Sequence, residues 1–448
     1  MSLSTITSNA QIAFEQYISF SHQQRAAFLE AIATNIESLG DELIETASQE
    51  TNLPAARLQG ERGRTCYQLR MYAAMLLKGD YVDATIETAV PTKTPPKPDI
   101  RSMFQPMGPV VVFGASNFPF AYSTAGGDTA SALAVGCSVI VKAHPAHIKT
   151  SSLVATAIQK AIVDCSMPAH VFQHVSAAEL LMNEIDLGKA LVQDNAIAAV
   201  GFTGSRVGGR ALLDYATARK NPIPVFAEMG SVNPVILLSN KMAENPEALA
   251  AGLAGSVCLG VGQFCTNPGL IILQKKDAAF LDLLAAELDK LALGTFLTPG
   301  IANAYAAGVS KLAKNAKKLT SRELPSPALF VSDAASANHS ILEEVFGPCT
   351  VAILVEDQSE MLSFIESLDG QLTGTIHGTK SEISEELVDT LLQKVGRLLF
   401  NGFPTGVEVS GAMVHGGPFP ATTDSRSTSV GTQAIYRFTR MVCLQNQI

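Results

Sequence analysis

Apolar positions recur at helical spacing through residues 11–80, and the pattern changes after that point. Ser21 and Gln24 stand in the spacing of a capping box, at the start of a helix that continues to Gly40. Prolines, threonines and lysines then alternate through residues 82–107. Proline removes a backbone donor, so this stretch suits an extended arm or an edge segment better than a core strand.

From residue 109 onward, short apolar runs alternate with helix-like stretches. The pattern predicts strands at 109–114, 138–142, 171–175, 197–202 and 224–228, and helices at 123–136, 150–163, 177–192 and 206–219. Alternating βα units form parallel sheets with helices on both faces. We therefore expect a doubly wound α/β domain that binds its ligand at the carboxyl ends of the strands.

A second α/β set follows the first. Its strands are predicted near 234–238, 269–274, 349–355, 371–376 and 397–401. Residues 432–438 alternate apolar and polar side chains, which predicts an exposed edge strand. The fold class is thus α/β, with two doubly wound domains and a small β element.

Composition excludes several classes of protein. With 448 residues the chain is long enough for two or three domains, and 47% hydrophobic with 16% charged residues indicates a compact soluble protein. A net charge of −9 and scattered basic residues argue against binding to nucleic acid. No apolar run reaches the roughly 18 residues that span a bilayer, and the N-terminus lacks a signal pattern. We expect a cytoplasmic protein with no membrane partner.

The cysteines and histidines predict no metal site. Seven cysteines, without a Cys-x-x-Cys pair, fit reduced thiols better than a disulfide framework or a zinc site. His144 and His147 lie in a loop-like stretch without acidic or thiol neighbours.

Two residues carry the strongest candidate chemistry. Cys265 lies in the sequence GQFCT at 262–266, at the end of an apolar helix-like run. Glu228 ends an apolar strand, where a carboxylate is costly to bury unless it has partners or a function. A thiol in a turn, with a carboxylate able to activate water, is the minimum set for covalent oxidation of a carbonyl. The alternative for Cys265 is a buried small hydrophobe.

Three other positions have a functional and a structural interpretation. The turn Gly201–Ser205, between a strand and a helix, could meet a phosphate or be a plain turn; the familiar Gly-x-Gly-x-x-Gly is absent. Asn117 could donate to an oxyanion, although Asn is common in turns. Lys142 could hold a ribose or a phosphate, or simply solvate the end of a strand.

These motifs occur in one order along the chain: Asn117-Phe118-Pro119, Lys142, Gly201-Phe202-Thr203-Gly204-Ser205, Glu228-Met229-Gly230, Gly262-Gln263-Phe264-Cys265 and Glu344-Val345-Phe346-Gly347-Pro348. That order closely resembles the aldehyde dehydrogenase superfamily, from about residue 20 to the C-terminus. The phrases at 114–120, 125–134 and 401–409 resemble bacterial α-ketoglutaric semialdehyde (2,5-dioxovalerate) dehydrogenases and related NADP-using fatty aldehyde dehydrogenases.

The resemblance implies a role for each catalytic position. Cys265 would attack the aldehyde to give a thiohemiacetal. The Asn117 amide and the Cys265 backbone N–H would stabilise the oxyanion. After hydride transfer to the nicotinamide, Glu228 would activate the water that releases the acid.

The resemblance also implies cofactor contacts. Lys142 and Glu344 would hold the riboses, Ser205 in the turn with Gly201 would meet the pyrophosphate, and Phe346 would flank the nicotinamide ribose. Many NAD-preferring members follow the strand lysine with Pro-x-Glu. No acid follows Lys142 here, which admits a 2′-phosphate and gives His144 a phosphate contact, with a neutral loop histidine as the alternative. We expect NADP to be preferred and NAD to be accepted.

For the substrate, residues 59–65 precede the helix that lines the substrate tunnel in this superfamily. We expect Arg64 or Arg62 to pair with the distal carboxylate of a keto-acid semialdehyde, and Phe118 to line the same site. The alternative is a salt bridge with Glu61 at the entry of the helix.

The expected domains follow from the resemblance. Residues 1–81 and 108–229 would form the cofactor domain, 230–429 the catalytic domain, and 82–107 with 430–448 a bridging element. An exposed edge strand invites pairing, so a homodimer or homotetramer is expected.

The expected function is NAD(P)-dependent oxidation of α-ketoglutaric semialdehyde to 2-oxoglutarate in a bacterial cytoplasm. The alternatives are a fatty or other aliphatic aldehyde as substrate, an acyltransferase or thioesterase that uses Cys265 without redox chemistry, and a non-catalytic protein on the same scaffold.

Overall fold

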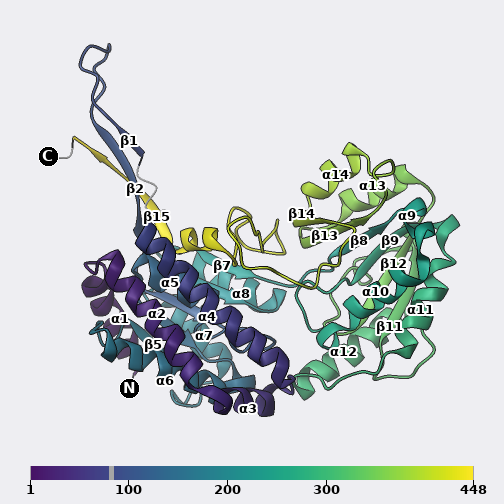
Figure 1. The fold of residues 1–448 in the computed structure, drawn as a ribbon, viewed down its shortest axis with the longest axis horizontal. Coiled ribbons are helices and arrows are strands. Elements are labelled where there is room, and N and C mark those ends of the chain that lie inside the picture. The colour runs from purple at the N-terminus through teal and green to yellow at the C-terminus, as the bar shows by residue number, and fades with distance from the viewer. Residues whose placement is uncertain (1, 80–84, 447–448) are drawn as a thin grey trace.

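The framework of the molecule is three β-sheets. The computed structural model describes residues 2–79 and 85–446, which contain one sheet of five strands, one of seven and one of three. The five- and seven-stranded sheets form the centres of two lobes, and the three-stranded sheet projects from the first lobe (Figure 1). The predicted fold class is confirmed. The domain limits stay predictions, and the limit at residues 81–82 lies outside the described residues.

Four helices open the chain, as the periodicity predicts. They are α1 (Leu3–Tyr17), α2 (His22–Ser38), α3 (Gly40–Thr51) and α4 (Ala55–Lys78). The capping box before α2 is confirmed: the Ser21 side chain accepts from the backbone of Gln24, and the Gln24 side chain accepts from the backbone of Ser21. Phe28 of α2 and Tyr72 of α4 are fully buried in the core of the first lobe.

The five-stranded sheet is parallel throughout, in the order β5-β4-β3-β6-β7. Its strands are β3 (Val110–Phe113), β4 (Val139–Lys142), β5 (Phe172–Val175), β6 (Ala199–Thr203) and β7 (Val225–Glu228). The helices between them are α5 (Gly127–Val135), α6 (Ile148–Asp164), α7 (Glu184–Gln193) and α8 (Arg206–Thr217). One face packs against α2 and α4–α6 and the other against α1, α7 and α8, so the strands read as continuous apolar runs.

The order of these strands locates a ligand crevice. The chain enters at β3, adds β4 and β5 on one side, and then adds β6 and β7 on the other side. The strand order therefore reverses between β3 and β6, and α/β sheets bind ligands outside the carboxyl ends of the strands at such a point.

Two predicted helices begin later than expected. The helix predicted at 177–192 starts at Glu184, because the Asn183 side chain caps it by accepting from the backbone of Asp186. The helix predicted at 123–136 starts at Gly127, because the preceding residues form turns that carry the chain over the sheet edge.

The second lobe contains the seven-stranded sheet, in the order β10-β11-β12-β9-β8-β13-β14. Its strands are β8 (Pro234–Leu237), β9 (Leu270–Gln274), β10 (Lys317–Lys318), β11 (Ala328–Asp333), β12 (Cys349–Val355), β13 (Gln371–His377) and β14 (Val395–Phe400). Strands β10 and β11 were not predicted from the sequence. Its helices are α9 (Ser239–Glu244), α10 (Pro246–Cys258), α11 (Phe280–Lys290), α12 (Pro299–Leu312), α13 (Gln358–Ser367) and α14 (Glu385–Leu392). Helices α9–α11 cover one face and α12–α14 the other.

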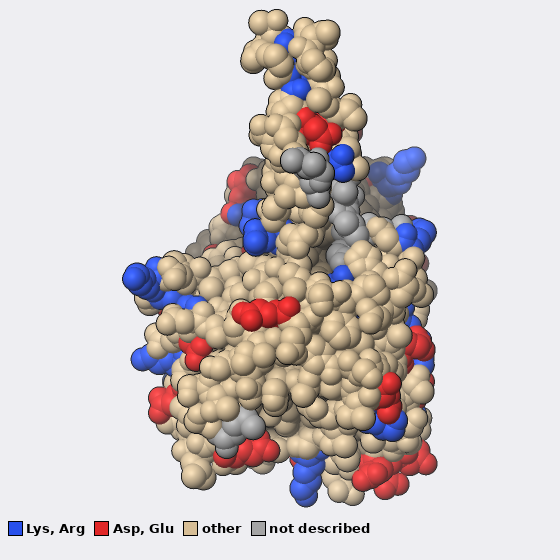
Figure 2. All heavy atoms as spheres, turned by 90° about the vertical axis from the view of Figure 1, so that its left-hand side faces the viewer, with Lys and Arg blue, Asp and Glu red and all other residues tan. Residues whose placement is uncertain are grey.

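The projecting sheet joins residues 85–106 to the last strand of the chain. It pairs β1 (Thr85–Glu87), β2 (Ile100–Pro106) and β15 (Thr439–Gln445) in antiparallel order, as expected for an extended arm (Figure 1). On the face seen in Figure 2, lysines and arginines are interspersed with acidic residues. None of the helices in the described ranges is both long and apolar enough to cross a bilayer.

The strand predicted at 432–438 is wrong. Thr432–Phe438 is a 3₁₀-helix, η5, and the strand begins at Thr439. The alternation was misleading because Ile435, Arg437 and Phe438 all turn into the core, where the Arg437 guanidinium pairs with Asp128 at 2.5 Å. A strand would direct successive side chains to opposite faces.

Candidate active site

The turn that carries Cys265 is held rigidly. It follows α10 through a short 3₁₀ segment, η2 (Leu259–Gly262). Gly262 has φ +65°, and a Cβ there would lie 2.3 Å from the carbonyl carbon of Gly347, so only glycine fits. The Asn233 side chain donates to the Cys265 carbonyl at 2.8 Å. These contacts fix the half-buried thiol at the junction of the two lobes.

Cys265, Glu228 and His415 form one cluster. His415 Nε2 lies 3.5 Å from Cys265 Sγ and 3.0 Å from Glu228 Oε1. The other Glu228 oxygen accepts from the Ser429 hydroxyl at 2.8 Å. Glu228 and His415 are both buried. His415 was not predicted from the sequence, because a single histidine followed by two glycines offers no local signal of a functional residue.

The two acids of this cluster are shifted in opposite directions. Burial raises the pKa of Glu228, but the charge and hydrogen bonds of His415, Ser429 and Cys265 outweigh it and leave the pKa lowered. Burial, and then the charge of Glu228, raise the pKa of the Cys265 thiol well above its usual value. At neutral pH the resting site therefore holds a thiol next to a carboxylate.

Asn117 lies in the turn that follows β3, and it lines the same cavity as Cys265 and Glu228. Its buried amide donates one hydrogen bond to the Gln263 carbonyl at 3.0 Å, and an amide nitrogen carries a second N–H. Arg57 donates to the Asn117 carbonyl at 2.7 Å, and Glu61 accepts from the backbone of Phe120 at 2.8 Å. Helix α4 thus holds the loop that carries this amide.

Arg57 and Glu61 are further residues that the sequence did not single out. The Arg57 guanidinium lies between the rings of Phe118 and Phe264, 5.0 and 4.9 Å from their centroids. Glu61 is fully buried, and its pKa is raised, with desolvation as the largest cause. Arg57 and Glu61 are four residues apart on α4, and this spacing was the only local sign that they belong to the site. The same spacing is equally typical of an ordinary ion pair on a helix.

A cavity of about 410 Å³ joins the thiol to the carboxyl ends of the first sheet. Eight of the predicted residues line it, and six of them come from the first lobe and the thiol turn: Asn117, Phe118, Glu228 and Cys265 near the thiol, and His144 and Ser205 near the ends of the strands. Glu344 and Phe346 from the second lobe line it as well. The cavity therefore opens on both lobes.

The ends of β6 and α8 fit a pyrophosphate. Ser205 caps α8 by accepting from the Gly208 backbone at 3.1 Å, so the helix N-terminus faces the cavity. A Cβ on Gly204 or Gly208 would lie 2.6 or 2.9 Å from the Phe202 ring. Glycine at these two positions leaves the backbone close to the cavity, as a bound nucleotide requires. Gly201 itself does not reach the cavity, since it is buried in β6 against Asp128.

Lys142 ends β4 and is buried, and its ammonium contacts the carboxylate of Glu184 at the start of α7. Burial lowers the pKa of Lys142 to about 8. Burial, with the neighbouring His147 and Lys142, lowers the pKa of His144 to about 3, so this histidine is neutral. It can contact a phosphate only as a neutral donor.

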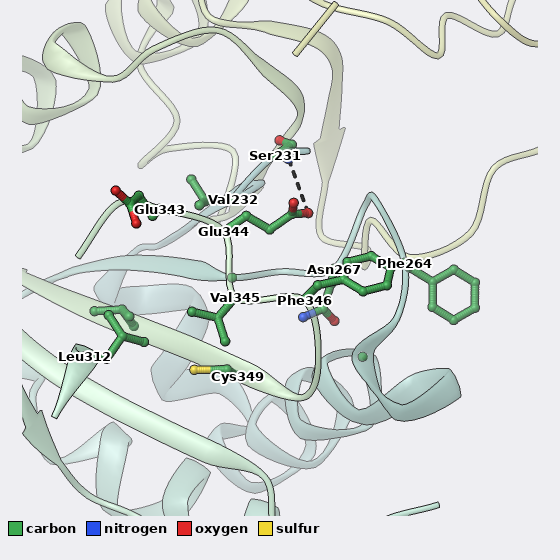
Figure 3. A pocket seen from close by; sticks show the side chains of 13 residues that line it. Ser231, Val232, Phe264, Asn267, Leu312, Glu343, Glu344, Val345, Phe346 and Cys349 are labelled. Atoms are coloured by element: carbon green, nitrogen blue, oxygen red, sulfur yellow. Dashed lines mark hydrogen bonds between the residues drawn. The ribbon is translucent and has the colours of Figure 1, made fainter. Parts of the chain in front are cut away.

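Glu344 and Phe346 lie on the loop before β12. The Glu344 carboxylate points back toward the junction of the lobes, where the Ser231 backbone donates to it at 3.4 Å (Figure 3). A Cβ on Gly230 would lie 2.0 Å from this carboxylate. The absence of a side chain at Gly230 therefore leaves room for Glu344, the residue that the family resemblance expects to bind a ribose.

The two arginines predicted for the substrate lie apart. Arg64 stacks its guanidinium over the Tyr122 ring, which lines the cavity, and donates to the Tyr122 hydroxyl at 3.4 Å. Its other terminal nitrogen, Nη1, is buried and has no partner among the described residues. Arg62 points away, because it donates to the Gly40 carbonyl at 2.8 Å, and the structure does not bring it to the site.

The acid, thiol and imidazole are also potential metal ligands. One ligand atom from each of Glu228, Cys265 and His415 lies within 4.8 Å of the others. The sequence did not predict this donor set, because the three positions share no spacing of a metal motif.

Comparison with known proteins agrees with this geometry. The aldehyde dehydrogenase family model matches residues 2–439. An α-ketoglutaric semialdehyde dehydrogenase of Acinetobacter baylyi is 46% identical, over 99% of this chain and 87% of its own, and α-ketoglutaric semialdehyde dehydrogenase 2 of Azospirillum brasilense is 48% identical, over 98% and 85%. The solved γ-glutamyl-γ-aminobutyraldehyde dehydrogenase of Burkholderia cenocepacia shares the fold, with a TM-score of 0.81 at 18% identity over 99% of this chain and 88% of that one. The chain belongs to the aldehyde dehydrogenase family.

Proposed function

We propose that this protein oxidises α-ketoglutaric semialdehyde to 2-oxoglutarate with NAD(P), through a covalent intermediate on Cys265. The observation that carries the proposal is the placement of the thiol, Glu228 and the Asn117 amide around one cavity that extends to the N-terminus of α8, with His415 in contact with both the thiol and Glu228. A nucleophile, a base, an oxyanion donor and a nucleotide crevice are the parts that this reaction needs.

The first step forms a bond between Cys265 Sγ and the aldehyde carbon. The thiol is protonated at rest, so its proton must leave as the bond forms. His415 Nε2, at 3.5 Å from the sulfur, is placed to accept that proton and to hold it as an imidazolium beside the Glu228 carboxylate, 3.0 Å away. The Asn117 amide and the Cys265 backbone N–H stabilise the oxygen, which becomes an oxyanion.

Release of the acid depends on Glu228. When bound, the nicotinamide supplies the hydride acceptor that turns the adduct on Cys265 into a thioester. Glu228 is ionised at neutral pH because its partners lower its pKa, so it can take a proton from the attacking water. Hydrolysis then restores the thiol and frees the carboxylic acid.

The proposed cofactor contacts are Ser205 for the pyrophosphate, Lys142 and Glu344 for the riboses, and Phe346 beside the nicotinamide. We propose NADP as the preferred cofactor and NAD as an accepted one, because residues 143–147, directly after Lys142, contain no acid. The Glu184 carboxylate, which contacts Lys142, opposes this preference and makes use of both cofactors the expected result.

The substrate proposal rests on the two curated relatives and on Arg64. Both relatives carry α-ketoglutaric semialdehyde in their names and match nearly the whole chain. A carboxylate at the far end of the substrate would give the buried Arg64 Nη1 the partner that it lacks among the described residues. The aromatic wall of Phe118, Tyr122 and Phe264 supports an aliphatic aldehyde as the second candidate.

The proposed setting is the bacterial cytoplasm, with the chain in a homodimer or homotetramer. All seven cysteines are free, which suits a reducing compartment. Strands β1 and β15 are both edges of the projecting sheet, and Met441 on β15 is 66% exposed. Edges of this kind are usually paired or covered. Light scattering after gel filtration measures the oligomeric state directly.

The test is the absorbance of the reduced nicotinamide as aldehyde is added, with NADP and NAD in parallel. α-Ketoglutaric semialdehyde should give rapid reduction that Cys265→Ala abolishes. Activity only with an aliphatic aldehyde would keep the mechanism and reject the substrate. A folded protein that reduces neither cofactor with any aldehyde would reject the proposal and favour a non-catalytic role.

A further inference from the structure

The end of β4 is the place where an α/β nucleotide site usually carries its ribose-binding acid. In such sites an acidic residue near the end of the second strand accepts hydrogen bonds from the ribose hydroxyls of NAD, whereas a cation there accommodates the 2′-phosphate of NADP. Strand β4 is the second strand of this sheet in chain order, and it ends at Lys142 with no acid in residues 143–147 directly after it. The sequence at this point therefore supplies a cation for a 2′-phosphate, Lys142, but no acid for the ribose hydroxyls.

The fold supplies an acid from a different element. Glu184, in the first turn of α7, contacts the Lys142 ammonium across a separation of 42 residues. The Lys142 side chain is 9% exposed and the Glu184 side chain is 42% exposed. The lysine is therefore enclosed, while the carboxylate that covers it is partly exposed, and His144, two residues after Lys142, lines the cavity.

This pair affects the two cofactors in opposite ways. A carboxylate at the ribose accepts from its hydroxyls, which favours NAD. The same carboxylate repels a 2′-phosphate, and it occupies the ammonium that would otherwise neutralise that phosphate. His144, the other basic side chain near this point, is neutral and cannot replace the lysine.

We infer that Glu184 sets the balance between NAD and NADP, by providing the ribose acceptor that the strand itself lacks and by withholding Lys142 from the 2′-phosphate. The inference rests on the proposed use of a nicotinamide dinucleotide in this crevice. Glu184 is a specificity-determining residue in this scheme and takes no part in the chemistry at Cys265.

Isothermal titration calorimetry of the unreacted protein tests the inference without turnover. The dissociation constants of NAD and NADP are measured for the wild type, Glu184→Gln and Asp186→Asn. Asp186 is the matched control, because it lies in the same helical turn and its change removes the same charge, but its partner is Asn183 rather than Lys142. Glu184→Gln should shift the ratio of the two dissociation constants toward NADP by about tenfold or more, and Asp186→Asn by less than about twofold.

The outcomes separate the inference from the function on which it rests. An unchanged ratio in Glu184→Gln, with both nucleotides still binding, overturns the inference and leaves the proposed function standing. An equal shift in both variants also overturns it, since a general loss of negative charge would then explain the effect. A folded wild-type protein that binds neither nucleotide overturns both.

Discussion

Replacing Arg64 with methionine tests the substrate proposal most directly. The Arg64 guanidinium stacks on the Tyr122 ring with its centroid 5.2 Å away and makes a long, 3.4 Å hydrogen bond to the Tyr122 hydroxyl. Its Nη1 is buried and lacks a partner among the described residues. A methionine keeps most of the length and the apolar stem while removing the charge. The variant therefore separates recognition of a carboxylate from packing against the aromatic wall.

The size of the effect follows from the hydrogen bond that the substrate would make. A hydrogen bond to a charged group contributes about 1.5–3 kcal/mol. At about 1.4 kcal/mol for each factor of ten, kcat/KM for α-ketoglutaric semialdehyde should fall between about 10-fold and 150-fold. Pentanal has a chain of the same length without the carboxylate, so its kcat/KM should change by less than about twofold.

Steady-state reduction of the cofactor, measured for both aldehydes, gives these ratios. Arg62→Met is the matched control, since Arg62 lies on the same helix but donates to the Gly40 carbonyl, away from the cavity. It should leave the ratio of the two substrates unchanged. Equal losses for both substrates in Arg64→Met would refute the reasoning, because Arg64 would then act by holding Tyr122. An unchanged KM for the carboxylated aldehyde would refute it as well.

Three further predictions concern the thiol, the base and the core. Glu228→Gln should leave a burst of about one equivalent of reduced cofactor in rapid mixing, followed by turnover lowered about 100-fold or more, because the base for hydrolysis is lost; loss of the burst would contradict this role. The raised pKa of Cys265 keeps its thiol protonated, so alkylation by iodoacetamide should accelerate about tenfold per pH unit from pH 7 to 9, whereas a plateau below pH 8 would contradict the shift. Arg437→Met leaves the Asp128 carboxylate buried without the guanidinium that it contacts at 2.5 Å, and urea unfolding should show a loss of about 3–5 kcal/mol; a loss under about 1 kcal/mol would contradict this account.

The sequence by itself determined the class of fold and the order of its elements. Periodicity predicted the N-terminal helices, the parallel strands and the extended arm, because burial on one face or on both faces repeats at a fixed interval along the chain. The ordered motifs around Asn117, Glu228 and Cys265 identified the family, and the structure places these three residues around one cavity.

Local pattern was insufficient where a contact elsewhere decides the conformation. Residues 432–438 alternate like a strand, yet they form a 3₁₀-helix because their side chains fit the core beside Asp128. The strand β10 was missed because its two residues are lysines, and β11 was missed although its first three residues, Ala328, Leu329 and Phe330, are fully buried.

Only the tertiary structure decided which distant side chains meet. His415 lies 150 residues from Cys265 along the chain, and Glu184 lies 42 residues from Lys142, so neither pairing leaves a periodic trace in the sequence. Arg62 and Arg64 are two residues apart and look interchangeable, but successive helical positions differ by about 100° in direction. The helix therefore turns Arg64 toward the cavity and Arg62 toward Gly40.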